Sequence, residues 1–357
     1  MTALRKHNNM PGITIHDVAE ECGLSVATVS RVLSGSDYPV KPETRQRILE
    51  AAEKTGYVPN MLARGLKTKA INEIAVIIPS IQNPFYTSMV GGIESVLLES
   101  AYGMSLYLTD HYGQRTNLLI NNLIGKMISG IIIAADSITP SIYEALRNLK
   151  EKNNVSIIAT DYQVKDCIFP GVYFDYFEGA KMAVEYLFNQ GHSRIAFGFC
   201  PLDRETRKAR LAGVRAACGR LGNEEIETDY YESSAKTDFL AGMELAEVIR
   251  KSNKGYTAIV AHNDSVAVGL LAGLAEQKVS VPDEISVIGF DDCIYAMMCR
   301  PTLTTVRVPS QQMGDLAAHI LLNELGGKEA CSNIYLEPKI IKRESVRKAI
   351  NRVRHGS

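Results

Sequence analysis

The segment TIHDVAEECGLSVATVSRVLSG, residues 14–35, constrains the fold more than any other part of this sequence. It predicts two short helices joined by a turn at Gly23, because glycine readily takes the left-handed conformation that ends a helix. Thr14 and Asp17 have capping-box spacing at the start of the first helix, and Ser25 can cap the second. Helices this short are unstable alone in water, so the pair must either dock on a further element or read a partner.

The apolar positions of the two helices predict one shared core. Four side chains of the first helix recur every three or four residues, as one helix face requires: Ile15, Val18, Ala19 and Cys22. The second helix turns Val29, Val32 and Leu33 toward the same core. Its other side chains are predicted to point outward: Val26, Ala27, Thr28, Ser30 and Arg31.

A third helix is predicted over KPETRQRILEAAEKTG, residues 41–56. Pro42 suits its first turn and Gly56 suits its end, and its inward positions are Ile48, Ala51 and Ala52. The second helix alone could belong to an interaction hairpin with a solvated polar face. Two helices, a glycine turn at fixed offset and a third helix behind them favour a helix-turn-helix bundle instead.

The outward face of the second helix suits DNA. The hydroxyls of Ser25, Thr28 and Ser30 can bond to phosphate oxygens. Arg31 can reach the O6 and N7 edge of guanine. Residues 1–70 contain ten Lys and Arg against seven Asp and Glu, whereas the remainder contains 29 against 33. The basic excess at this end indicates an anionic partner.

From Glu73 onward, the sequence changes to short apolar runs that are typical of buried strands. Eight runs are predicted to be strands: residues 73–80, 103–110, 129–136, 155–161, 171–175, 194–200, 257–264 and 285–292. Amphipathic helical segments lie between most of them, for example residues 176–190, 208–221 and 265–277. Alternating strands and helices indicate parallel doubly wound sheets, and this number of strands indicates two such units.

Polar residues gather where the predicted strands end, which is where open α/β sheets bind ligands. They are Ser80–Asn83, Asp110, Asp136, Asp161, Asp175, Asn263, Asp264, Asp291 and Asp292. Dinucleotide-binding, phosphate-loop, nucleophile-elbow and zinc-protease motifs are absent. No catalytic residue, metal ligand or cofactor is therefore predicted. His262 beside Asn263 could serve proton transfer, but a strand-end histidine more often has a structural role.

Composition excludes several classes of protein. No apolar run reaches the roughly 18 residues that a membrane helix needs, and residues 1–12 lack the apolar core of a secretory signal. The seven cysteines are scattered without paired or CxxC spacing, which predicts reduced packing residues. The expected location is the cytoplasm.

Residues 14–68 closely resemble the headpiece of the lactose/galactose repressor (LacI/GalR) family of bacterial transcriptional regulators. The resemblance implies that Val26 and Ala27 form the base-reading pair and that Arg31 contacts a base. Lys41 stands where a serine is common, which loses a helix cap and adds a charge that can reach phosphate.

The resemblance also implies a hinge over YVPNMLARGLKTKA, which read alone is a basic, proline-containing linker. In the family this segment becomes helical only on DNA, where two copies enter the minor groove and a leucine wedges into the central base step. Leu66 matches that leucine, and Gly65, in place of a more usual serine or glutamine, predicts a less ordered hinge without DNA. The implied DNA contacts are Thr14, Ser25, Val26, Ala27, Thr28, Ser30, Arg31, Lys41, Asn60, Ala63 and Leu66.

The remainder of the chain resembles the effector domain of the same family, which is itself similar to periplasmic sugar-binding proteins. PSIQNPFYTSMVGGIE, RKARLAGVRAA, AHNDSVAVGLLAGL and VPDEISVIGFDD carry this resemblance. The implied effector-binding residues are Ser80, Phe85, Tyr86, Asp161, Arg210, Asn263 and Asp291. Such a set suits a polyol, because carboxylates, amides and a guanidinium bond to hydroxyls while aromatic faces stack on C–H surfaces.

Two positions qualify the expected ligand. Arg210 also suits a carboxylate or phosphate, so acidic sugars and nucleobases remain open as effectors. Val308 stands where the family commonly has a glutamine, so no polar contact to the ligand is expected from this side of the site.

The predicted fold is α/β, with an all-α helix-turn-helix headpiece and a periplasmic-binding-protein-like body of two doubly wound parallel-sheet subdomains. The expected domains are a headpiece (1–58), a hinge (59–71), an effector-binding and dimerisation domain (72–345) and a tail (346–357).

The expected function is a homodimeric transcriptional regulator, favoured as a repressor, that binds a palindromic DNA operator. A small molecule, favoured as a sugar or sugar derivative, controls it, and no enzymatic activity is expected. The alternatives are a sugar-binding protein of a transport system, which needs no headpiece, and an α/β enzyme, which lacks its motifs here.

Overall fold

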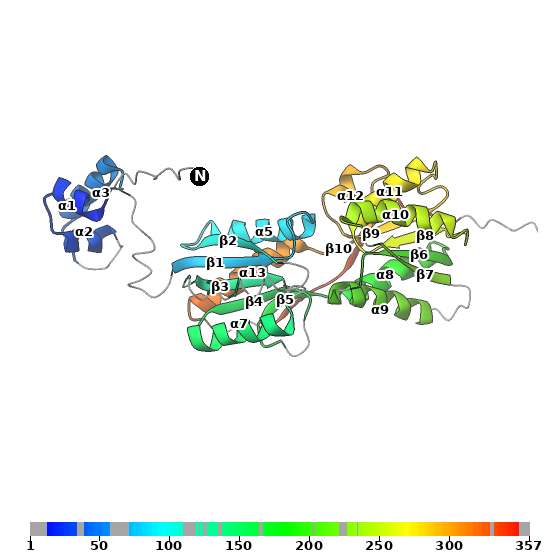
Figure 1. Cartoon of the computed structure of the whole chain (residues 1–357), viewed down its shortest axis with the longest axis horizontal. Helices are drawn as coiled ribbons and strands as arrows, with labels where there is room; N and C mark the ends of the chain where they lie inside the picture. The colour runs from blue at the N-terminus through cyan, green and yellow to red at the C-terminus, as the bar shows by residue number, and fades with distance from the viewer. Residues whose placement is uncertain are drawn as a thin grey trace, which may run out of the picture. The chain divides into compact units, whose positions relative to one another are not determined.

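The computed structural model describes residues 13–33, 39–57, 71–109, 119–120, 122–123, 126, 128–134, 138–163, 167–202, 204–220, 227–233, 235–328 and 332–349. The chain forms two compact units, Met1–Ile71 and Asn72–Ser357. The described helices of the first unit form a small bundle, and both sheets belong to the second (Figure 1).

The first unit contains the three predicted helices. They are α1 (Ile15–Glu21), α2 (Val26–Leu33) and α3 (Pro42–Thr55). Their shared core consists of Val18, Ala19, Cys22, Val29, Val32, Ile48, Ala51 and Ala52. The predicted core of the bundle is therefore confirmed, with Ile15 and Leu33 packing at its edge.

The predicted helix ends are also present. The Asp17 carboxylate accepts the backbone N–H of Thr14 at 2.6 Å, and Ser25 Oγ accepts the N–H of Thr28 at 3.2 Å. Gly23 and Gly56 have φ values of 59° and 69°, in the left-handed region where glycine is preferred. Gly23 and the Ser25 cap fix the turn between α1 and α2, and Gly56 ends α3.

The second unit contains two six-stranded sheets, each at the centre of one lobe (Figure 1). The sheet of the first lobe has the order β11-β5-β4-β3-β1-β2. Its strands are β1 (Ile71–Ile78), β2 (Gly103–Leu108), β3 (Ile128–Ala134), β4 (Ser156–Asp161), β5 (Gly171–Phe174) and β11 (Ile334–Leu336). The sheet of the second lobe has the order β12-β10-β9-β8-β6-β7. Its strands are β6 (Arg194–Phe199), β7 (Glu227–Glu232), β8 (Ala258–Ala261), β9 (Ser286–Asp291), β10 (Thr304–Arg307) and β12 (Lys339–Ile341).

All eight predicted strands exist, and both sheets are dominated by parallel pairs, so the predicted fold class is confirmed. Four strands were not predicted: β7, β10, β11 and β12. The strand β12 pairs antiparallel with β10, which departs from the wholly parallel expectation.

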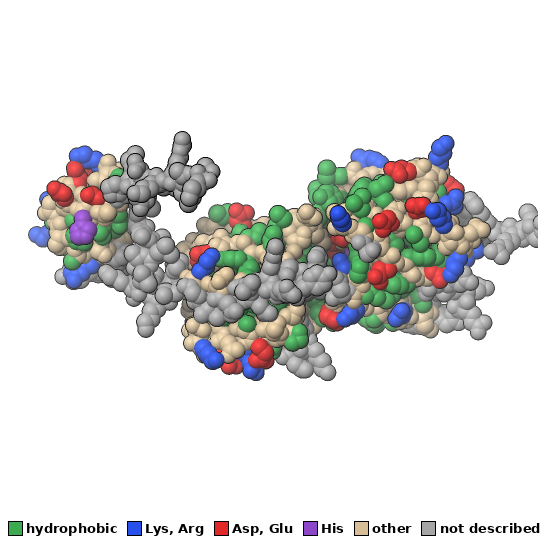
Figure 2. All heavy atoms as spheres, viewed as in Figure 1, with side chains coloured by type: hydrophobic (Ala, Val, Ile, Leu, Met, Phe, Trp, Pro, Cys, Tyr) green, Lys and Arg blue, Asp and Glu red, His purple; other side chains and the backbone are tan. Residues whose placement is uncertain are grey.

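Helices cover both faces of each sheet. Those of the first lobe are α5 (Pro84–Leu97), α7 (Pro140–Asn153) and α13 (Ser310–Leu325). Those of the second are α8 (Tyr176–Asn189), α9 (Glu205–Arg220), α10 (Asp238–Lys251), α11 (Asp264–Glu276) and the short α12 (Tyr295–Met298). In Figure 2, acidic and basic side chains are interspersed over the face of the second unit that is in view.

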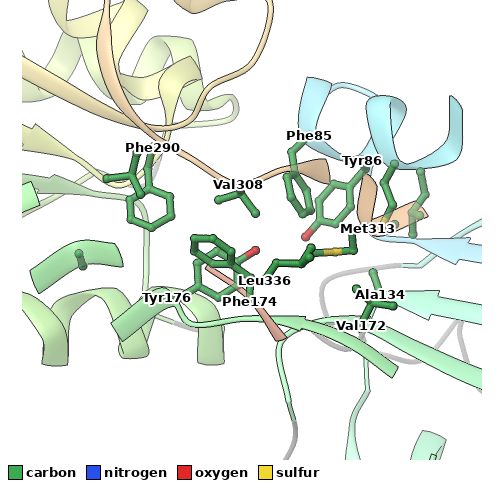
Figure 3. Close-up of a cluster of buried hydrophobic side chains, with 14 of the residues drawn as sticks. Phe85, Tyr86, Ala134, Val172, Phe174, Tyr176, Phe290, Val308, Met313 and Leu336 are labelled. Atoms are coloured by element: carbon green, nitrogen blue, oxygen red, sulfur yellow. The ribbon is translucent and has the colours of Figure 1, made fainter. Parts of the chain in front are cut away.

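The chain passes between the lobes three times: after β5, after β10 and between β11 and β12. These connections lie near an aromatic cluster. Figure 3 shows Phe85 and Tyr86 on one side of it and Phe174, Tyr176 and Phe290 on the other. The lobe junction is therefore a packed core beside the strand ends.

Candidate functional site

A cleft of about 620 Å³ lies at the carboxyl ends of the strands and is lined by both lobes. All seven residues proposed for effector binding line it: Ser80, Phe85, Tyr86, Asp161, Arg210, Asn263 and Asp291. They come from segments far apart in the chain, which meet because parallel strands end at the same edge of a sheet. A volume of this size suits a small organic ligand.

Asp161 ends β4 and presents a carboxylate to the cleft. It accepts the hydroxyl of Tyr176, and the hydroxyl of Tyr86 at 3.4 Å. Burial, and then the charge of Asp161, raise the pKa of Tyr176 well above its usual value. Tyr176 therefore stays protonated and donates, which holds the carboxylate in place.

Asp291 ends β9 at the matching position of the second lobe. Its Oδ1 lies 3.3 Å from a terminal nitrogen of Arg210, and both side chains are buried. Burial raises the pKa of Asp291 well above its usual value, while Arg210 acts in the opposite direction. The guanidinium also lies over the rings of Tyr176 and Phe290, at 4.3 and 4.4 Å from their centroids.

Arg210 also has a donor that the described residues leave unsatisfied. Its Nε is buried and has no hydrogen-bond partner among the described residues. An unsatisfied buried donor costs about 1–3 kcal/mol, so a ligand oxygen that accepted this hydrogen bond would gain from it.

A second polar network lies at the starts of α10 and α11. Asn263 donates to the Asp238 carboxylate at 2.7 Å, and the Cys200 thiol donates to the same group at 3.4 Å. The backbone N–H of Cys200 lies 3.3 Å from His262 Nδ1 and donates to it, which leaves the imidazole proton on Nε2. Burial lowers the pKa of His262 to about 3, so the ring is neutral.

Cys200, Asp238 and His262 also offer three metal-ligand atoms within 4.8 Å of one another. The sequence did not suggest this grouping, because the residues come from three separate segments. The three residues are already linked by hydrogen bonds to one another and to Asn263. The positive charges of three nearby arginines also help to lower the pKa of His262. This surrounding positive charge disfavours a cation.

Other strand-end polar residues have structural roles, which corrects the expectation that they would cluster with the ligand groups. Asp175 caps α8 by accepting the N–H of Glu178 at 2.9 Å. Asp264 accepts the Thr305 hydroxyl at 2.6 Å. Asp292 pairs with two arginines, and neither it nor Asp175 or Asp264 lines the cleft. Asp110 and Asp136 lie outside the described residues.

Sequence patterns did not predict several residues that line the cleft, and they assigned one of them a structural role. His262, interpreted as structural, is buried and also lines the cleft. The unpredicted lining residues include Arg204, Thr206, Arg207, Lys236, Thr237, Asp238, Phe239 and Tyr295. Most stand at the starts of α9 and α10, and the start of α10 was hidden because β7 before it was not recognised. Val308 packs in the lobe core, in agreement with its apolar side chain (Figure 3).

In the first unit, the side chains of Ser25, just before α2, and of Ala27 and Arg31 on α2 are exposed. Those of Thr28 and Ser30 are half-buried. Val26 was expected to point outward, and this is wrong. It is half-buried against the core, because it precedes Val29 by three residues and shares its face.

The remaining predicted DNA contacts divide into two groups. Thr14 and Lys41 are exposed at the starts of α1 and α3. Lys41 makes no side-chain cap, as its sequence predicts. Asn60, Ala63 and Leu66 lie outside the described residues.

Among the described helices, none is both long and apolar enough to cross a membrane.

Fold and cleft together define a two-lobed ligand-binding body joined in one chain to a helix-turn-helix unit. Residues 14–60 match the model of bacterial regulatory proteins of the lacI family, and residues 184–346 match the periplasmic binding protein-like domain. Catabolite control protein A of Priestia megaterium is 33% identical over 91% of this chain and 96% of its own length. The ribose operon repressor of Escherichia coli K12 is 30% identical over 87% of this chain and 93% of its own.

The structural comparison agrees. The Lac repressor dimer bound to operator and the anti-inducer ONPF has a TM-score of 0.81 and 25% identity, over 94% of this chain and 99% of that one. The chain belongs to the LacI family of bacterial transcriptional regulators. It is a DNA-binding regulator, and the named relatives are regulators rather than transport proteins or enzymes.

Proposed function

We propose that this regulator represses transcription as a cytoplasmic homodimer, and that a sugar-like molecule in the cleft controls its binding to operator DNA. The observation that carries the proposal is that one cleft receives Asp161 from the first lobe and Asp291 and Arg210 from the second. A ligand that contacts all three binds best at one relative orientation of the lobes. It can therefore shift a conformational equilibrium by its difference in affinity for the two states.

The DNA-binding part of the proposal rests on α2 as the recognition helix. Its outer face would meet the major groove, with Ala27 and Arg31 near base edges and Ser25 near phosphate. Val26, half-buried here, would reach bases only through its exposed portion. By resemblance, Ala63 and Leu66 would enter the minor groove and Asn60 would cap the hinge.

We assign residues 1–58 to the headpiece, 59–71 to the hinge, 72–345 to effector binding and dimerisation, and 346–357 to a tail. In this scheme the cleft groups bind and orient a ligand without converting it. Turnover of a cleft ligand by the purified chain would favour an enzyme instead.

Selection of binding sites from random duplex DNA tests the DNA-binding part. We expect the full chain to enrich a palindrome of roughly 16–20 base pairs, with half-sites about one helical turn apart. The enriched site should bind at least about a thousandfold more tightly than a shuffled control at physiological salt. Equal affinity for both duplexes would contradict sequence-specific regulation.

A further inference from the structure

We propose that Arg47 of α3 is a positioning residue for DNA recognition. Its guanidinium fixes the turn between α1 and α2 and thereby sets the angle at which α2 meets the major groove. Arg47 itself does not contact DNA in this scheme, because it acts through the backbone carbonyl of Cys22. The inference rests on the proposed function, which assigns α2 as the recognition helix.

Arg47 reaches the turn from a distant part of the chain, 25 residues beyond Cys22. Its Nε donates to the Cys22 carbonyl oxygen at 3.0 Å, and its Nη2 donates to the same oxygen. Arg47 is an exposed residue, so its side chain is free to extend into solvent instead. Two N–H donors of a planar, rigid guanidinium on one oxygen fix the direction of approach as well as the distance.

The Cys22 carbonyl lies at the end of α1, where a helix leaves carbonyl groups without partners of its own. Cys22 is the C-cap of α1 and is only 3% exposed. The next backbone N–H, that of Gly23, bonds to the Glu20 carbonyl at 3.1 Å. Among the described residues, the hydrogen bonds to the Cys22 carbonyl come from Arg47. A buried carbonyl without a donor is unfavourable, so the guanidinium holds this carbonyl in one place.

The guanidinium also packs on the turn itself. A Cβ on Gly23 would lie 3.3 Å from Arg47 Nη2, which is closer than ordinary van der Waals contact. Only Gly23, Leu24 and Ser25 separate Cys22 from the first residue of α2. A displacement of the Cys22 carbonyl is therefore transmitted to the start of α2.

The apolar core of the first unit defines this angle less sharply. Four of the eight buried side chains in the described core are alanine or cysteine, which are small and interlock little. Hydrophobic contact is also non-directional. A hydrogen bond depends strongly on its angle, so the contact between Arg47 and the turn adds the directional restraint that the core lacks.

Lys54 provides a matched cation on the same helix. Its Nζ lies 2.6 Å from Glu21 Oε1, so it too links α3 to the end of α1. The Lys54 side chain is 72% exposed, and its contact is with a side chain rather than with the backbone of the turn. Exposed ion pairs of this kind contribute little. Replacing Lys54 removes the same charge as replacing Arg47 but leaves the turn bonded.

The test is the affinity of full-length variants for the operator enriched from random DNA and for the shuffled duplex, at one salt concentration. We expect Arg47→Gln to lower operator affinity about tenfold or more, because both half-sites of a dimer lose alignment with base edges. Arg47→Lys should lose nearly as much, since an ammonium keeps the charge but lacks the planar pair of donors. Shuffled DNA, which is bound mainly through charge, should bind Arg47→Lys like the parent.

Lys54→Gln is the control for charge. It should lower both affinities by the same small factor, so that their ratio stays at the parent value. Hydrogen exchange of the headpiece in each full-length variant shows whether this unit stays folded. A smaller folded fraction lowers both affinities together, whereas a misplaced α2 lowers operator affinity selectively. The ratio of the two affinities therefore separates positioning from stability.

Several results would overturn the proposal. If Arg47→Lys binds the operator as tightly as the parent, Arg47 supplies only charge, as a phosphate contact would. Equal losses for Arg47→Gln on both duplexes, or an unfolded headpiece in both Arg47 variants, would make Arg47 a stability residue. An unchanged operator affinity for Arg47→Gln would show that the turn is fixed without it. A parent that binds both duplexes equally would instead reject the proposed function, and this inference with it.

Discussion

Asp161 and Asp291 show at the residue scale how function departs from local preference. Each ends a central strand of one lobe, with φ values of 81° and 114°. Such conformations are uncommon for residues other than glycine and cost of order 1–3 kcal/mol each. The two carboxylates nevertheless face the same cleft. The surrounding sheets therefore hold both side chains in the cleft at a local cost, which agrees with the ligand-binding role proposed for them.

Arg31 is the residue whose replacement should most clearly separate base reading from general DNA affinity. It is exposed on α2, and Arg31→Ala should cost about 1–3 kcal/mol per half-site on the selected operator if it contacts guanine. Binding to shuffled DNA should fall much less. Titrations of both duplexes at one salt concentration measure the difference, and equal losses would mean that Arg31 contacts only phosphate.

His262 should make the body less stable in acid. Its pKa is lowered to about 3, chiefly by burial, whereas an unfolded histidine titrates near about 6.5. Between these values the unfolded chain binds the extra proton, so stability falls as the pH falls, by up to about 1.4 kcal/mol per unit. We expect His262→Gln to reduce the loss between pH 6.5 and 5 by about 2 kcal/mol.

Asp264 should have the opposite effect on the pH dependence of stability. Burial raises its pKa to about 7, so between about pH 4 and 7 the folded chain retains a proton that the unfolded chain releases. This group therefore adds stability as the pH falls, and Asp264→Asn should steepen the acid loss. Urea unfolding of both variants across this range measures the slopes. Parallel pH profiles for the parent and both variants would contradict the assignment.

At the scale of elements, the sequence predicts what is buried and periodic. The eight apolar runs became strands because each is covered by helices. In the headpiece, α1 begins at its predicted capping box, and α3 begins at Pro42 and ends at Gly56 as predicted. β7, with the sequence ETDYYE, is a polar edge strand and carries no apolar run, while β11 and β12 have three residues each. These strands depend on pairing with distant segments, which a local pattern does not record.

Close helix packing is a second property of elements that the sequence did not indicate. The helices α5 and α13 approach so closely that a Cβ on Gly92 would lie 2.1 Å from the Gln311 carbonyl oxygen. A Cβ on Gly314 would lie 2.0 Å from the Met89 carbonyl oxygen. Both clashes are with backbone, so neither can be relieved by rotating a side chain.

Gly92→Ala should therefore destabilise the body by about 1–3 kcal/mol. Gly91→Ala is the adjacent control on α5, where an added Cβ meets no described atom within 4 Å. That change should be neutral or stabilise the helix by up to about 1 kcal/mol. Chemical denaturation of the two variants compares them directly, and equal stabilities would contradict the close approach of α5 and α13.

At the scale of the whole molecule, the order of elements predicts two lobes, and the ends of parallel strands predict where ligands bind. That reasoning, with the family resemblance, identified seven cleft residues from the sequence. The sequence did not identify Arg204, Arg207 and Lys236. They stand near the starts of α9 and α10, and only the tertiary structure brings these helix starts to the cleft. The charge of the cleft is thus a property of tertiary structure.

The central claim is that occupancy of the cleft controls DNA binding. The most direct measurement is the operator affinity of the full chain with and without a saturating amount of a ligand. The ligand is the sugar or sugar derivative that raises the melting temperature of the full chain most. The parent should change its affinity by about 5–150-fold. Asp291→Asn, which removes a cleft carboxylate, should bind the operator like the unliganded parent and respond weakly or not at all. If the parent binds the operator equally well in both conditions while the compound occupies the cleft, the account is contradicted.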